Sequence, residues 1–158
     1  MKVLAIDPGY DRLGVAIMEY RDGKEFICYS TCVLTDKKSP LADRLLAVGN
    51  TIKTLIKEHV PDTIAIETLF FNKNITTAIG VAQARGIIIY LAKVAGCTLY
   101  EFGPQEIKVA VTGYGNSDKR AVYDMITRLV PNVPAKAHDD EYDAIAVGIT
   151  CLAQHGRN

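Results

Sequence analysis

The sequence lacks a net charge, closely paired cysteines and a long apolar run at its N-terminus. Its 18 basic and 18 acidic side chains balance, which argues against a protein that coats nucleic acid non-specifically. No CxxC pair occurs, so we expect four reduced core thiols, at Cys28, Cys32, Cys97 and Cys151. The first apolar stretch is broken at Asp7, too early for a signal peptide or a membrane span. We therefore expect a cytoplasmic protein with no membrane partner.

The even balance hides an excess of basic side chains in the middle of the chain. Residues 68–136 carry eight Lys or Arg against four acids, and both flanks are slightly acidic. Divalent cations bound by the flanks would invert the local field there. A polyanion could then approach a basic surface beside a metal-neutralised cleft.

The apolar pattern predicts one α/β domain spanning residues 1–158. We expect strands at 2–6, 13–19, 25–34, 63–66 and 98–102, and helices at 40–59, 74–95, 104–111, 118–130 and 140–154. The Asp22-Gly23 pair predicts a hairpin, and Ser39-Pro40 predicts an N-cap with a first-turn proline. This order favours a five-stranded mixed sheet with helices on both faces, the layout of an RNase H-like domain.

The expected helix at 74–95 is apolar around most of its circumference. Such a helix is buried on more than one face. The sheet of so small a domain can cover only one side, so we expect a partner subunit to cover part of the rest.

Four acids lie where the expected strands end or the last helix begins. Asp7 follows the first apolar strand, and Glu67 follows the strand at 63–66. Asp140 and Asp143 are three residues apart and share one helix face. Acids delivered at the carboxyl ends of buried strands typically mark a site.

This pattern is typical of a two-metal phosphodiester nuclease. Two divalent ions activate a water, relieve charge on the phosphate and stabilise the leaving oxygen. Mg²⁺ prefers oxygen ligands, so such a site needs Asp and Glu but no Cys or His. Taken singly, each acid is more often a turn or surface residue than a ligand, and only their joint pattern favours a site. Asp139 is a rival to Asp140 as first ligand on the last helix.

Several motifs together resemble the RuvC family of Holliday-junction resolvases over residues 1 to about 150. They include Asp7-Pro8-Gly9 with Gly14, Ala65-Ile66-Glu67 followed by Phe70, and Lys73-Asn74. Gln83-Ala84-Arg85-Gly86 and Asp140-x-x-Asp143-Ala144 complete the set. The sequence departs from the family in placing Glu141-Tyr142 between the last two acids, where small residues are common.

The resemblance implies a homodimeric endodeoxyribonuclease that nicks two opposing strands of a four-way DNA junction in recombination and repair. Two Mg²⁺ per subunit, with Mn²⁺ as a substitute, would be bound by Asp7, Glu67, Asp140 and Asp143. Phe70 matches the family's junction-probing aromatic, and Lys108 and Lys119 match its basic residues near the cleaved strand. We also expect Phe71, Lys73 and Tyr114 to contact DNA, and branch-migration motor proteins to act as partners.

Other readings compete with this one. A related nuclease acting on RNA or on other branched DNA would keep the four acids but not the Phe70 turn or the motif at 83–86. Actin-like kinases also place an acid and a glycine after their first strand, but they need two such domains. A non-catalytic DNA-binding module would have no use for all four acids.

Overall fold

The computed structural model describes residues 1–68 and 75–156, and its centre is a five-stranded sheet. The strands lie in the order β3-β2-β1-β4-β5, with β1, β2 and β3 antiparallel and β4 and β5 parallel to β1. Their bounds are β1 (Lys2–Asp7), β2 (Arg12–Arg21), β3 (Lys24–Leu34), β4 (Thr63–Glu67) and β5 (Thr98–Phe102). The predicted mixed sheet is confirmed.

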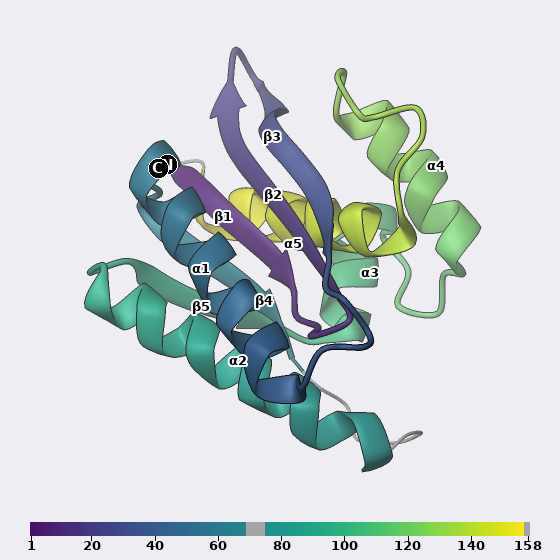
Figure 1. Cartoon of the computed structure of the whole chain (residues 1–158). Coiled ribbons are helices and arrows are strands. Elements are labelled where there is room, and N and C mark those ends of the chain that lie inside the picture. Colours follow the sequence, from purple (N-terminus) through teal and green to yellow (C-terminus); the bar gives the residue numbers. More distant parts are fainter. Residues whose placement is uncertain (69–74, 157–158) are drawn as a thin grey trace.

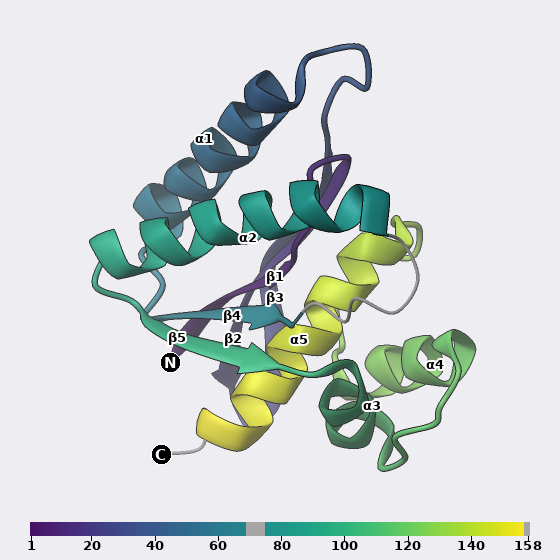
Figure 2. The same ribbon diagram turned by 90° about the horizontal axis from the view of Figure 1, so that it is seen from below.

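Helices cover both faces of the sheet, as predicted (Figures 1 and 2). One face packs against α1 (Leu41–His59) and α2 (Ile75–Val94). The other packs against α5 (Asp139–His155), flanked by α3 (Pro104–Thr112) and α4 (Lys119–Leu129). Because side chains alternate along a strand, Leu4 and Ile6 belong to the first core and Val3 and Ala5 to the second.

Two local predictions meet different outcomes. The hairpin is confirmed, with positive φ at Asp22 (49°) and Gly23 (84°), as a tight hairpin turn requires. The N-cap prediction is wrong by one residue, because Pro40 itself caps α1 and makes no side-chain cap bond.

The prediction of four core thiols is only half right. Cys97 and Cys151 are buried, but Cys28 is exposed and Cys32 half-buried, and all four are free. Both exceptions lie on β3, which forms an edge of the sheet. In the β2–β3 pairing, Ile17 is opposite Tyr29 and the next residue, Met18, is opposite Ile27. Cys28 is therefore the extra residue of a β-bulge, and the inward–outward alternation of the strand does not apply to it.

Within residues 77–94 of helix α2, whose burial the structure describes, the buried side chains lie on one face. Ala84, Ile88 and Ala92 are buried, whereas Ile79, Tyr90 and Val94 are each about two-thirds exposed. By length and composition alone, Thr77–Val94 could cross a membrane, with a mean hydropathy of 1.3 and 22% of its residues buried. A single helix of this kind is weak evidence for a membrane span, because the core helix of a soluble protein passes the same test.

Candidate active site

Two of the predicted acids end neighbouring parallel strands. Asp7 is the last residue of β1, and Glu67 is the last residue of β4. Ile6 is opposite Ile66 in the β1–β4 pairing. The two carboxylates therefore leave the sheet side by side at one edge.

The first turn of α5 brings Asp140 to the same edge, and Gly14 makes this approach possible. Gly14 pairs with Asp7 across β1 and β2. A Cβ atom at Gly14 would lie 1.8 Å from the backbone oxygen of Asp140 and 3.3 Å from Cβ of Asp7. The helix can therefore contact β2 only because residue 14 has no side chain.

The carboxylates form one electrostatic cluster. Burial, then repulsion from Glu67, Asp143 and Asp140, raises the pKa of Asp7 to about 8. Burial, then repulsion from Asp143, raises the pKa of Glu67 to about 7. Burial also raises the pKa of Asp143, against the opposing effect of Lys119. Such a cluster favours bound cations, which would relieve the repulsion.

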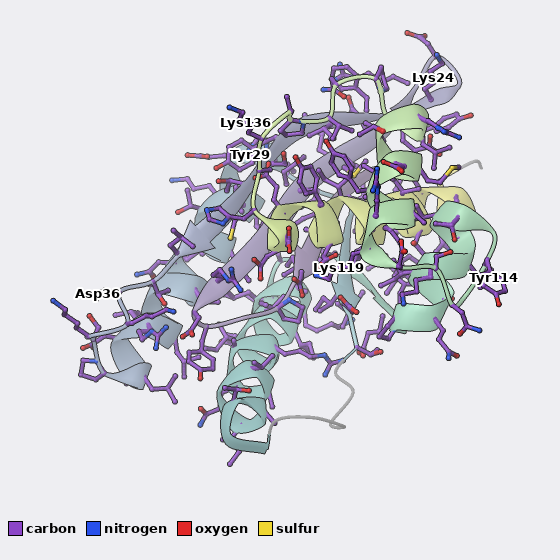
Figure 3. The ribbon with its side chains drawn as sticks, turned by 90° about the vertical axis from the view of Figure 1, so that its right-hand side faces the viewer. Lys24, Tyr29, Asp36, Tyr114, Lys119 and Lys136 are labelled. Atoms are coloured by element: carbon purple, nitrogen blue, oxygen red, sulfur yellow. The ribbon has the colours of Figure 1, made fainter. Side chains whose placement is uncertain are left out.

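Two predicted lysines lie beside this cluster. Nζ of Lys119 is 3.2 Å from Oδ2 of Asp143, and Lys108 lines a cavity of about 240 Å³ together with Glu67, Asp143 and Lys119. Figure 3 shows Lys119 near the middle of this side of the molecule, whereas Tyr114 projects from the margin. The Tyr114 ring is exposed, so the structure brings both lysines, but not Tyr114, to the acids.

Asp139 and Asp140 differ sharply in their surroundings. The Asp139 side chain is 78% exposed, and that of Asp140 is 20% exposed. Oδ2 of Asp140 is buried and accepts no hydrogen bond from any described residue. Nε of Arg12 lies 3.3 Å from it, close enough for an ion pair but without hydrogen-bond geometry. This oxygen is thus available to a further cation.

No three Asp, Glu, His or Cys side chains converge tightly enough in the described part of the chain to hold one ion by themselves. Mg²⁺ usually takes one or two carboxylates from a protein and completes its shell with waters and substrate phosphate oxygens. The all-oxygen character of the cluster fits that ion.

Three predicted DNA contacts, Phe70, Phe71 and Lys73, lie outside the described residues. They remain predictions.

The side chains that contact the loop after Asp7 were not among the predicted site residues. Arg44 of α1 is buried and contacts Asp11, the hydroxyl of Thr35 and the ring of Tyr10. Gly80 of α2 packs against the same ring, and a Cβ atom added at Gly80 would lie only 2.5 Å from Cε1 of Tyr10. A signal for Arg44 was present, because it lies one turn before Val48 on the buried side of α1.

The second missed residue is Arg12, at the start of β2. Its contact with Asp140 depends on the α5–β2 packing, which no local pattern of the sequence reveals.

Comparisons with known proteins identify the family of the chain. The family model of crossover junction endodeoxyribonuclease RuvC matches residues 3–151. The chain is 40% identical over 157 residues to the Thermosipho melanesiensis protein of that name, covering 99% of both. It is 41% identical over 149 residues to the Finegoldia magna protein, covering 94% of this chain and 91% of the relative.

A solved structure, T. thermophilus RuvC in complex with a Holliday junction substrate, superimposes with a TM-score of 0.90 at 26% identity. That match covers 98% of this chain and 94% of the other. The end of the sheet where the four acids meet therefore belongs to a fold that this chain shares with a RuvC protein solved with its junction substrate. The chain belongs to the RuvC family of crossover junction endodeoxyribonucleases.

Proposed function

We propose that the protein is a metal-dependent endonuclease that resolves four-way DNA junctions by paired nicks near the crossover, in recombination and repair. The observation that carries this proposal is the meeting of acids from β1, β4 and α5 at one sheet edge, beside Lys108 and Lys119. A relative with the same fold has been solved with such a junction.

Asp7, Glu67, Asp140 and Asp143 would hold two divalent cations, Mg²⁺ or its substitute Mn²⁺. The raised pKa values of Asp7 and Glu67 and the unsatisfied oxygen of Asp140 support this assignment over Asp139. When bound, the ions would supply an activated water and neutralise charge on the phosphate.

The lysines have a separate task, which is to hold the cleaved strand. Lys119 is held near the acids by its ion pair with Asp143, and Lys108 lines the same small cavity. Both can bind phosphate oxygens as point charges. Phe70 and Phe71 would stack on bases opened at the crossover, with Lys73 and Tyr114 as outer DNA contacts.

A homodimer would supply the second nick, because two symmetric cuts need two sites related by a two-fold axis. The exposed side of α2 offers the interface. Ile79, Tyr90 and Val94 recur there with Gly86, and a Cβ at Gly86 would meet open space. A helix side that is apolar, and that has a glycine where nothing in this chain crowds it, suits close approach of a second copy.

Branch-migration motor proteins, which act on the same junctions in the cytoplasm, would be further partners.

The test is cleavage of a labelled four-way junction, a linear duplex of the same sequence and an RNA–DNA hybrid, each with and without Mg²⁺. We expect paired nicks near the crossover, on the junction alone and only with metal. Preferred cleavage of the hybrid would favour the RNA-directed alternative instead.

A further inference from the structure

Arg12 is poised beside the acids but is not fixed in the fold. Its side chain is 56% exposed, and its one ion pair among the described residues is with Asp140. Arg44, by contrast, is buried and held by Asp11 and Thr35. Arg44 is therefore a structural arginine, whereas Arg12 can move.

Arg12 lines a cavity of about 590 Å³ that reaches Asp7 and Asp140. Lys37, Thr35 and His138 lie on its walls. Its remaining acid, Asp11, is already paired with Arg44. With cations bound at Asp7 and Asp140, the charges left in this cavity would be those of Arg12 and Lys37.

The volume of the cavity is enough for one nucleotide unit, since ligand sites typically span about 300 to 1,000 Å³. Lys119 lines two other cavities, of about 490 and 240 Å³, which include Asp143 but not Arg12. Arg12 and Lys119 thus pair with different acids and face different spaces at the same edge.

We propose that Arg12 binds a backbone phosphate of the cleaved strand in the 590 Å³ cavity, as a positioning residue. The strand would then be held by Lys119 on one side of the carboxylates and by Arg12 on the other. A guanidinium presents a planar fork of donors that fits a phosphate with two hydrogen bonds. A cation on Asp140 would replace Arg12 there and free it for the strand. This inference rests on the proposed function.

Arg21 provides a matched control. It lies at the other end of the ten-residue strand β2, roughly 30 Å away at about 3.3 Å per residue. Its side chain is 54% exposed and pairs with one acid, Glu19. Arg21 also lies over the ring of Phe26. Arg12→Ala and Arg21→Ala therefore remove equal charge from opposite ends of β2, though not the same neutral contacts.

The measurement is junction affinity by fluorescence anisotropy across a salt series, with Ca²⁺ replacing Mg²⁺, alongside Mn²⁺ binding by calorimetry and thermal melting. We expect Arg12→Ala to weaken junction binding about tenfold and to lower the slope of log K against log salt by up to about one unit. Arg21→Ala should match wild type. Arg12→Lys should keep the slope and recover part of the affinity, because it retains the charge but not the fork.

A different result would show that Arg12 only neutralises the charge of Asp140 and does not bind the DNA strand. In that case Arg12→Ala tightens Mn²⁺ binding, while its junction affinity and salt slope equal those of Arg21→Ala, and the proposal is overturned. Failure of the wild-type protein to cleave the junction with Mg²⁺ would instead contradict the proposed function.

Discussion

Neighbouring acids on α5 differ at the scale of single residues. Asp140 is mostly buried with an unsatisfied oxygen, and Asp139 one position earlier points into solvent. Asp140→Asn should therefore reduce the single-turnover cleavage rate by a factor of about 10² or more, since a lost metal ligand acts on the transition state. Asp139→Asn should change it less than threefold. The reverse order would move the ligand to Asp139.

The raised pKa of Asp7 predicts a pH dependence of stability in metal-free protein. The folded state holds its proton up to about pH 8, whereas the unfolded chain loses it near pH 4. The unfolded state therefore binds fewer protons between these values, and stability falls as pH rises. Asp7→Asn removes this cost, so its gain in melting temperature should be larger at pH 8.5 than at pH 5.

Asp139→Asn is the control, because its carboxylate is exposed. An equal gain in melting temperature for Asp7→Asn at both pH values would show that ionisation of Asp7 does not destabilise the folded protein. Mg²⁺ should also stabilise the wild-type protein more at pH 8.5 than at pH 5, because the cation competes with protons for the same oxygens.

At the scale of elements, the site depends on how closely α5 approaches β2. Gly14→Ala would place a methyl group 1.8 Å from the backbone oxygen of Asp140, so the first turn of α5 must move. We expect a melting temperature several degrees lower and a loss of cleavage of at least about tenfold, since misplacement by about 1 Å is costly. Ala144→Gly, in the second turn of α5, also weakens the helix, by about 1 kcal/mol, and serves as the comparison. Equal activity losses in both variants would make the effect one of stability alone.

The elements themselves follow from local patterns. Acids at strand ends could be found from sequence because parallel strands β1 and β4 must end at the same edge. The exposure of Cys28 could not, because it arises from a register shift between two strands. The pairing of Arg12 with Asp140 could not either, because it depends on a helix packing against a strand more than a hundred residues earlier. Tertiary packing, not propensity, decides such contacts.

At the scale of the whole molecule, the exposed stripe on α2 predicts a dimer. Tyr90→Glu should shift the protein from dimer to monomer in sedimentation equilibrium, because a charge replaces an apolar group that would otherwise be covered. Val109→Glu is the matched control, since Val109 is 51% exposed on α3, over the opposite face of the sheet. A monomeric Tyr90→Glu variant should cut one strand of a junction without coordinated cutting of the other. If the Tyr90→Glu variant kept the mass of the wild-type protein, α2 would not be the dimer interface.

Helix α2 also links the proposed interface to the site, because Gly80 packs on Tyr10 in the loop that follows Asp7. Arg44 of α1 also contacts this loop, through the Tyr10 ring and Asp11. The proposed interface and the active site therefore share one structural support.

The claim that the acids hold the metal ions for strand cleavage is tested most directly at Asp143, which contacts Lys119. The measurement is the single-turnover rate of Mg²⁺-dependent junction cleavage by wild type and Asp143→Asn, with junction affinity measured in parallel. We predict a rate loss of at least about 10³-fold, with affinity within a few-fold of wild type and an unchanged fold by circular dichroism. Cleavage by Asp143→Asn at a near-wild-type rate would contradict the account.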